Sequence, residues 1–159
     1  MPNRVTAFVI PPGQGETIRG PVGGPLTIKA RAETTAGTFA LVDNVVGPGQ
    51  GPPLHVHARE DEMWYVLEGR FRVRADERFF DAPAGAFVFV PRGTHHCFQN
   101  VGEAPARILV MFTPAGMERF FERLAALPPG PADPAAYRAL ARECWMEVVG
   151  EPLAESHPL

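Results

Sequence analysis

Two stretches of the sequence decide the fold: residues 49–69, GQGPPLHVHAREDEMWYVLEG, and residues 85–100, GAFVFVPRGTHHCFQN. Both contain apolar and β-branched runs interrupted by glycine and proline, which is typical of strands joined by tight turns. His55 and His57 are two positions apart on a predicted strand, so both imidazoles project from one face. Glu62 follows five residues later, where a tight connection could bring its carboxylate back toward them. This pattern predicts a divalent transition metal site, which needs such donors held rigidly.

A solvated polar surface is the alternative interpretation of two histidines on one strand face, and it predicts polar neighbours. The sequence around His55 and His57 is apolar or aromatic instead. These neighbours are Leu54, Val56, Met63, Trp64, Tyr65, Val66 and Leu67. Burying imidazole nitrogens among them is costly without a partner, and a metal ion is one such partner.

The composition limits the kind of protein. With 159 residues, 45% of them hydrophobic and 21% charged, the chain fits one globular domain. A formal charge of −3 provides no basic field to hold nucleic acid. No apolar run approaches the roughly 20 residues that span a bilayer, and the first residues do not resemble a signal peptide. We therefore expect a soluble, cytoplasmic protein with no nucleic-acid or membrane partner.

Rare residues exclude two kinds of catalysis. The only serine is Ser156, in the last few residues, and the only lysine is Lys29. Serine hydrolases and Schiff-base enzymes are therefore improbable. Two cysteines, Cys97 and Cys144, do not make a disulfide framework, and we expect reduced thiols.

The rest of the chain predicts many short strands followed by helices. Strands are expected over 5–10, 25–34, 38–46, 54–58, 62–67, 70–75, 78–81, 86–90, 95–100 and 106–112. The dipeptide Glu68-Gly69 between two strand runs predicts a hairpin turn. After Phe112 apolar residues recur at helical spacing, and a first helix opens at Thr113-Pro114 and a second at Asp133-Pro134. Strands rich in glycine and proline turns indicate a sandwich or barrel.

The predicted organisation has four parts. Residues 1–24 form an N-terminal arm, whose glycine-rich part we interpret as a flexible connection rather than a phosphate loop. Residues 25–113 form the β-barrel, 114–147 a helical segment, and 148–159 a tail. The apolar stripes of the two helices predict packing against a sheet.

The spacing of the two stretches resembles the two conserved motifs of the cupin superfamily. The first motif matches at Gly49, His55, His57, Glu62 and Gly69. The second matches at Gly85, Pro91, Gly93, His96 and Asn100. Fifteen residues separate the motifs, as in small single-domain bacterial cupins, and the surrounding sequence is similar to the quercetin-dioxygenase-like members. The resemblance implies an all-β fold, a double-stranded β-helix or jelly-roll barrel, here with two C-terminal α-helices.

The resemblance also implies roles for individual residues. Cupins bind one metal per chain through the motif histidines and the glutamate, here His55, His57, Glu62 and His96. Asn100 would be structural. His95 and Cys97 flank His96 on a strand and should point away from the metal, so we exclude both as ligands. We interpret Cys97 as a small buried apolar residue, since adjacency in sequence is the wrong geometry for a Cys-His pair.

Three imidazoles and one carboxylate suit Fe, Mn, Ni, Co, Cu or Zn, and in a six-coordinate ion they leave two positions open. We expect an apolar cavity for a small-molecule substrate, with candidate lining residues Trp64, Phe71, Val73, Phe87, Phe89, Phe98 and Met111. The favoured hypothesis is a dioxygenase-type oxidoreductase acting on a small aromatic or enolisable compound, with Glu62 as catalytic base. The alternatives are a non-catalytic metal- or ligand-binding cupin, and a metal-assisted isomerase or decarboxylase. Because edge strands need covering, we also expect a homodimer.

Overall fold

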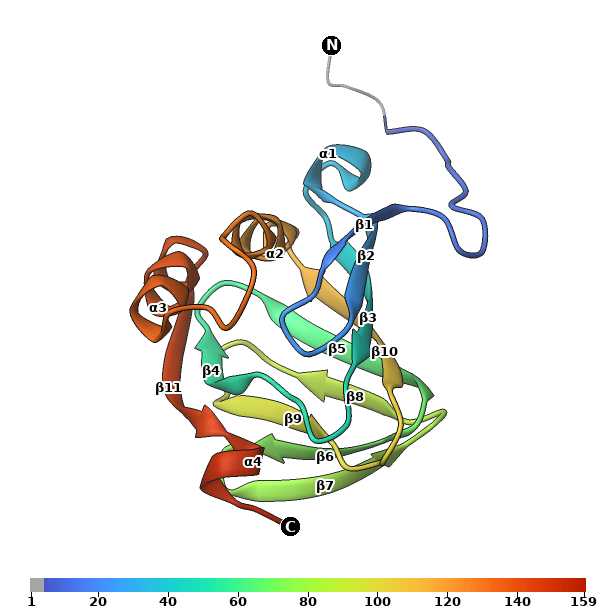
Figure 1. The fold of residues 1–159 in the computed structure, drawn as a ribbon. Coiled ribbons are helices and arrows are strands. Elements are labelled where there is room, and N and C mark those ends of the chain that lie inside the picture. The colour runs from blue at the N-terminus through green and yellow to red at the C-terminus, as the bar shows by residue number, and fades with distance from the viewer. Residues whose placement is uncertain (1–4) are drawn as a thin grey trace.

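Two antiparallel sheets facing each other make up most of the protein, as a computed structural model that describes residues 5–159 shows (Figure 1). The strands are β1 (Glu16–Arg19), β2 (Pro25–Ala30), β3 (Ala40–Val46), β4 (Pro53–His57), β5 (Asp61–Glu68), β6 (Arg70–Ala75), β7 (Arg78–Pro83), β8 (Phe87–Val90), β9 (His96–Asn100), β10 (Ala106–Thr113) and β11 (Met146–Pro152). The helices are α1 (Ala32–Thr35), α2 (Glu118–Ala125), α3 (Pro134–Glu143) and α4 (Leu153–Ser156).

The strand order identifies the architecture. One sheet has the order β1-β2-β3-β10-β5-β8 and the other β11-β4-β9-β6-β7, so consecutive strands alternate between sheets over much of the barrel. The predicted double-stranded β-helix is therefore confirmed. Strands β4 and β9 are joined by a single registered pair, His55 opposite His96.

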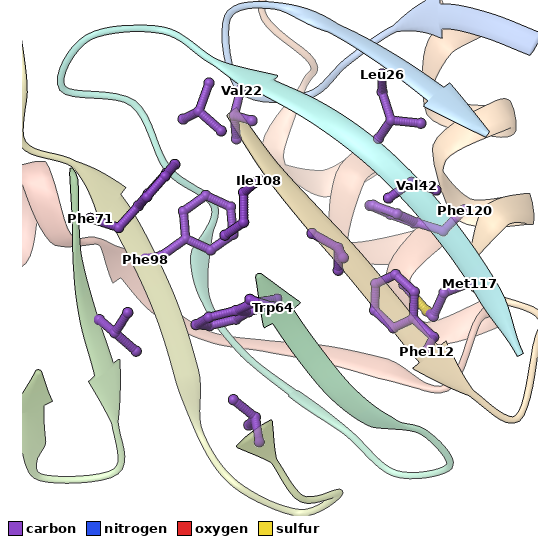
Figure 2. Close-up of a cluster of buried hydrophobic side chains, with 14 of the residues drawn as sticks. Val22, Leu26, Val42, Trp64, Phe71, Phe98, Ile108, Phe112, Met117 and Phe120 are labelled. Carbon is purple, nitrogen blue, oxygen red and sulfur yellow. The ribbon is translucent and has the colours of Figure 1, made fainter. Parts of the chain in front are cut away.

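The hydrophobic core fills the space between the sheets. Residues on β10 alternate between inward and outward positions, and the four inward ones, Ala106, Ile108, Val110 and Phe112, are each at most 3% exposed. Large side chains from both sheets meet them, among them Trp64, Phe71 and Phe98 (Figure 2). Phe98 packs edge-on against Trp64 and against Phe71, a favourable arrangement for aromatic rings. The core is thus continuous with the part of the barrel where the histidines lie.

The hairpin predicted at Glu68-Gly69 is wrong, because β5 and β6 belong to different sheets and the turn carries the chain from one sheet to the other. Gly69 has φ +84°, and a Cβ built there would lie 2.6 Å from the Cβ of Ala106. Glycine is required at this turn for both its conformation and its lack of a side chain.

The N-terminal arm differs from the prediction in two places. Residues 5–10, expected to be a strand, form no strand and are exposed. Residues 16–19, expected to belong to a flexible connection, form β1 at the edge of a sheet. There Thr17 pairs with Thr27, and their hydroxyl oxygens lie 2.9 Å apart. The strand expected over 25–34 ends at Ala30, because α1 begins at Ala32.

Both predicted C-terminal helices are present as α2 and α3, but the first begins at Glu118 and not at Thr113-Pro114, because Thr113 is the last residue of β10. Residues 148–159 are not simply a tail. The second helix ends at Glu143, and Trp145 then adopts φ +59°, which turns the chain back toward the barrel. The carbonyl of Trp145 accepts a hydrogen bond from the amide of Ala58. Strand β11 then pairs with β4, placing Met146 opposite His57. The tail prediction missed this strand because its pairing with β4 is a tertiary contact that the local sequence does not encode. Among the described residues, no helix is long and apolar enough to cross a bilayer.

Candidate metal centre

Four side chains from three strands meet inside the barrel. His55 and His57 come from β4, Glu62 from β5 and His96 from β9. Their ligand atoms all lie within 4.8 Å of one another, and all four residues are buried. The convergence predicted for these residues is therefore confirmed.

The local structure explains how they converge. The period of two on β4 points both of its histidines into the barrel. Residues 58–60 then carry the chain across to the opposite sheet, where Glu62 faces back toward them. His96 lies opposite His55 on the neighbouring strand, with ring centroids 4.3 Å apart. The donors thus come from both sheets.

Hydrogen bonds fix the orientation of two of the imidazoles. Nδ1 of His55 donates to the carbonyl of Pro53 over 2.7 Å, and Nδ1 of His96 donates to the carbonyl of Thr94 over 2.8 Å. Because a carbonyl oxygen can only accept, both rings carry their proton on Nδ1 when neutral. This leaves Nε2 of each ring as the nitrogen for a metal.

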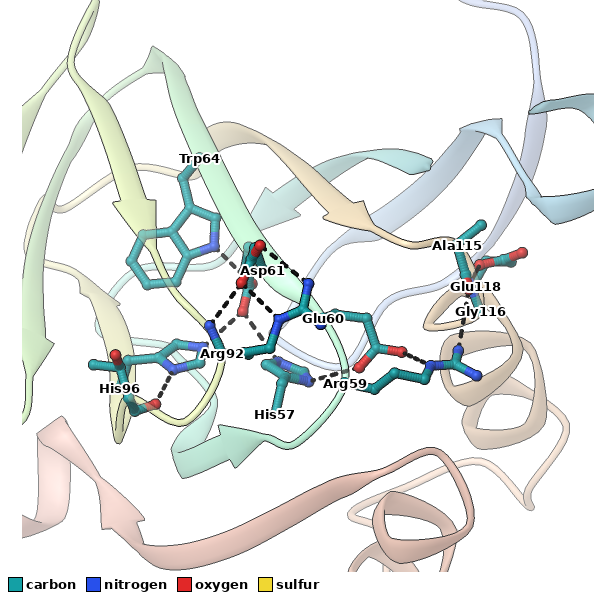
Figure 3. Close-up of polar contacts among 12 residues, drawn as sticks. His57, Arg59, Glu60, Asp61, Trp64, Arg92, His96, Ala115, Gly116 and Glu118 are labelled. Carbon is teal, nitrogen blue, oxygen red and sulfur yellow. Dashed lines mark hydrogen bonds and ion pairs between the residues drawn. The ribbon is translucent and has the colours of Figure 1, made fainter. Parts of the chain in front are cut away.

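The third imidazole has a different partner, a buried carboxylate (Figure 3). Nδ1 of His57 lies 4.0 Å from Oε2 of Glu60, and neither atom has a hydrogen-bond partner. Oε1 of Glu60 accepts a bond of 2.8 Å from Nε of Arg59, whose Nη2 donates to the carbonyl of Ala115 over 3.1 Å. Glu60 is thereby held beside His57, in the position of the carboxylates that orient metal-binding histidines elsewhere.

Sequence reasoning missed Glu60. The available signal was a run of three acidic residues, Glu60, Asp61 and Glu62, between a histidine pair and an apolar strand. The three separate in the structure, because Asp61 turns outward to pair with Arg92 while the other two face inward.

The two oxygens of Glu62 have different environments. Oε2 lies 2.6 Å from Nε2 of His96 and 3.1 Å from Nε2 of His57. Oε1 accepts a hydrogen bond of 2.6 Å from the indole nitrogen of Trp64. Oε2 is therefore the oxygen directed at the imidazoles, and Trp64 fixes the carboxylate from the other side.

The cluster favours one anionic and one neutral group. Burial would raise the pKa of Glu62, but nearby His96 and His57 hold this pKa well below its usual range. Burial, with His96 and His57, lowers the pKa of His55 well below its usual value. For His96 burial also lowers the pKa, yet Glu62 outweighs it and the pKa is raised. The cluster thus presents a carboxylate and at least one neutral imidazole, the protonation states that metal binding requires.

The donor set fits a divalent transition metal. Nε2 of His57 is buried and lacks a hydrogen bond of acceptable geometry, although Oε2 of Glu62 is nearby. Such an orphaned nitrogen is costly unless an ion takes the place of a hydrogen-bond partner. Without a thiolate among the four residues, the site suits borderline and hard metals that accept imidazole and carboxylate.

The two residues that flank His96 lie outside the cluster. His95 is exposed, and Cys97 is buried on the other face of β9, in a small group with Leu54 and Leu153. Burial raises the pKa of the Cys97 thiol to about 11, so it stays protonated near neutral pH. Its interpretation as a small buried apolar residue agrees with this environment.

A cavity of about 40 Å³ adjoins three of the clustered residues, His55, His57 and Glu62. Its walls are mostly apolar, and one side comes from the segment after the barrel: Met117, Phe120, Phe121, Tyr137 and Met146. Phe112 forms part of another side, with its ring centroid 5.6 Å from that of His57. The C-terminal helices therefore cover the mouth of the barrel.

Of the residues proposed to line a substrate cavity, the structure places only Phe98 on its wall. Trp64, Phe71 and Val73 are buried in the core instead, where Trp64 acts on Glu62.

For three residues the prediction that they line the cavity is wrong. Phe87 and Phe89 are 63% and 55% exposed on the outer face of β8, whose inward residues are Val88 and Val90. Met111 also faces outward, and its neighbours Val110 and Phe112 line the cavity. On these strands large apolar residues also occupy the outer face, so hydrophobicity alone cannot distinguish it from the inner one.

Comparison with known proteins identifies relatives of the barrel. The family described as "Cupin domain" matches residues 44–112. Protein SchB of Streptomyces halstedii is 30% identical over 70% of this chain and 78% of its own. MJ1618 of Methanocaldococcus jannaschii is 33% identical over 44% of this chain and 56% of its own. Quercetin 2,3-dioxygenase of Bacillus subtilis is 28% identical over 82% of this chain but 36% of its own. This chain spans only about half the length of several of the curated relatives that it matches.

Solved structures share the fold. KdgF from Halomonas sp. superposes with a TM-score of 0.63 at 19% identity, over 72% of this chain and 99% of that one. An RmlC-like cupin from Shewanella frigidimarina gives a TM-score of 0.59 at 22% identity, over 73% and 99%.

Proposed function

Because this chain belongs to the cupin superfamily, we propose that it is a metal-dependent enzyme of the dioxygenase type, acting on a small aromatic or enolisable organic compound. One observation carries the proposal: a buried set of three imidazoles and one carboxylate directly adjoins an apolar cavity. A set of four donors leaves two positions of a six-coordinate ion for reactants.

Each chain would hold one ion of Fe, Mn, Ni, Co, Cu or Zn through four residues. They are His55, His57, Glu62 and His96. A bound ion would polarise a substrate oxygen and make electron transfer to dioxygen feasible. The chain itself contributes orientation, through the Nδ1 bonds of His55 and His96, and exclusion of water, through the apolar walls.

Glu62 is the candidate catalytic base. Its Oε1 is held by Trp64, so if Oε2 were released from the ion, that oxygen could accept a substrate proton while the carboxylate kept its orientation. Over the whole reaction, one C–C bond of the substrate and the O–O bond break, and both oxygen atoms enter the product. The substrate supplies the four electrons that reduce dioxygen, so no other reductant is needed. A Glu62→Gln protein that keeps its metal and full turnover would remove this role.

Oxygen uptake tests the proposed reaction. Metal-loaded protein is incubated with a panel of flavonols, catechols and β-diketones in an oxygen-electrode cell, with His96→Ala as the metal-free control. Uptake that is lost in the variant, with both atoms of labelled dioxygen in the product, is the expected result. Product formed equally without oxygen would assign isomerisation or decarboxylation instead.

A non-catalytic role, in which the protein holds a metal ion without turning over an organic compound, is the second candidate, and the size of the cavity favours it. A volume of about 40 Å³ is far below the roughly 300 Å³ or more of common ligand pockets. A substrate could enter only if the C-terminal helices shifted. Metal binding with neither a bound compound from the panel nor product under either atmosphere would favour this role.

We also propose that the protein forms a homodimer through the outer face of β5, β8 and β10. Register places Tyr65 beside Phe87 and Met63 beside Phe89, and the three aromatic side chains are 46–63% exposed. At about 200 Å² each, they alone present roughly 300 Å² of apolar surface, which is the size of the largest patch on a typical monomer, and such patches are often functional. Edge strand β8 carries two of them, so a second copy would cover both the patch and the edge. Light scattering on the wild type and on Phe87→Asp should give a dimer and a monomer respectively.

A further inference from the structure

Asn44 is a buried polar side chain without a partner. It lies on β3, is 4% exposed, and lines the cavity beside the metal cluster. Its Oδ1 is buried and accepts no hydrogen bond, and within residues 5–159 no hydrogen bond of its amide group is found. It sits beneath the loop that carries Pro21 and Val22, which line the same cavity.

The other buried asparagine of the barrel, Asn100, has hydrogen-bond partners for both atoms of its side-chain amide. Nδ2 of Asn100 donates to the carbonyls of Val46, Gly47 and Ala104, and its Oδ1 accepts from the amide of Gly102. Asn100 therefore fixes a turn, as the family resemblance implied. No such contacts explain Asn44, and an amide left unpaired in an apolar wall is destabilising. A group of this kind indicates a ligand that completes it.

The register places Asn44 away from the metal cluster along the cavity. Glu62 is opposite Phe112, which is opposite Ala40, so Asn44 lies four residues farther along β3. At ~3.3 Å per residue, the Cα of Asn44 lies about 13 Å along β3 from the Cα of Ala40, which is level with Glu62. Between these levels the wall is apolar and includes Val110. The sheets thus contribute two polar positions to the cavity, the metal cluster and Asn44, and Tyr137 is a polar residue of the helical wall.

We propose that Asn44 is a specificity-determining residue that binds a hydroxyl group at the far end of the substrate. The inference rests on the proposed function and narrows its substrate class. The ligand is a mostly apolar molecule of two or three linked rings, with an enol or phenol oxygen for the ion at one end. At the other end a hydroxyl donates to Oδ1 of Asn44. The sheets fix both ends, and the C-terminal helices supply the wall that must move to admit the molecule.

Stability provides a test that needs no ligand. In metal-loaded protein, Asn44→Leu replaces an unpaired amide with an apolar group of similar size, so Tm should stay the same or rise by about 2 °C or more. Asn100→Leu is the matched control and should lower Tm strongly. A loss for Asn44→Leu as large as the control's would show a structural role and overturn the proposal.

Ligand discrimination provides the second test. Calorimetry without oxygen compares 3-hydroxyflavone with 3,7-dihydroxyflavone and 3,4′-dihydroxyflavone, which add one distal hydroxyl at either end. Wild-type protein should bind one of the two diols about tenfold more tightly than the parent, and Asn44→Leu should bind all three equally. Equal binding by the wild type, or a preference that persists in the variant, would overturn the proposal. A preference that depends on Asn44 without any oxygen uptake would support it and reject only the dioxygenase reaction.

Discussion

The indole nitrogen of Trp64 donates a hydrogen bond of 2.6 Å to Oε1 of Glu62, two residues earlier on the same inward face of β5. The bond restrains the carboxylate, and it places an intrinsic fluorophore one hydrogen bond from the metal cluster. Any ion bound by Oε2 would change the charge on Glu62 and so the environment of the indole.

Tryptophan emission should therefore report metal binding. The second tryptophan, Trp145, is 60% exposed and would mask the signal, so the measurement uses Trp145→Phe protein. Titration with Ni²⁺ or Co²⁺ should change the emission until one equivalent has been added. Adding His96→Ala to this background should abolish the change, whereas an unaltered signal would place the ion elsewhere.

Adjacent histidines provide a matched pair for metal stoichiometry. His96 belongs to the cluster and His95 is exposed, so the two variants differ by one position but act on opposite faces of the chain. Elemental analysis of protein purified without a histidine tag should give about one metal per chain for the wild type and His95→Ala. His96→Ala should retain little. Equal loss from both variants would contradict the assignment.

Glu60 is expected to act on the metal through His57. Glu60→Gln keeps the size of the side chain but removes the charge beside Nδ1 of His57, which lies 4.0 Å away. Competition with a chelator should show a loss of metal affinity of about 10- to 100-fold. Glu103→Gln, at an exposed position, is the control and should leave the affinity unchanged. A normal affinity in Glu60→Gln would limit Glu60 to its contact with Arg59.

The metal cluster could be predicted from the sequence because its ligands lie at short, fixed spacings within two segments. Two histidines on one strand face must point the same way, and the second motif supplied His96 and excluded its neighbours. Glu60 was missed because a carboxylate in an acidic turn reads as solvent-exposed, and only the fold shows that it is buried.

The face of the sheet to which a side chain points was harder to predict than the position of the strand. Phe89 and Met111 were placed in the cavity because they are large and apolar, yet the register turns both outward. Strand β11 was missed because its sequence has no strong strand pattern, and its pairing with β4 depends on Trp145 reversing the chain. Both errors concern tertiary contacts that local patterns do not encode.

The buried thiol of Cys97 should make stability fall in alkali. Its pKa is about 11 in the folded protein and 9.0 for an unperturbed thiol, so between these two pH values the folded chain keeps a proton that the unfolded chain loses. The free energy of unfolding should therefore decrease with rising pH, by up to about 1.4 kcal/mol per pH unit from this group. Denaturant titrations at pH 8, 9 and 10 should show a shallower decline for Cys97→Ala than for the wild type. Parallel declines would mean that the thiol does not contribute.

Strands β4 and β9 share only one registered pair, and its members are His55 and His96. The two strands are therefore joined by few backbone pairs at the position where two imidazoles would share an ion. An ion bound there would link β4 to β9. In chelated protein, β4 and the β11 strand paired with it would detach together, and their amides would exchange with deuterium sooner than those of β6. Metal-depleted protein should then be cleaved by proteases first at the strands that carry the four candidate ligands.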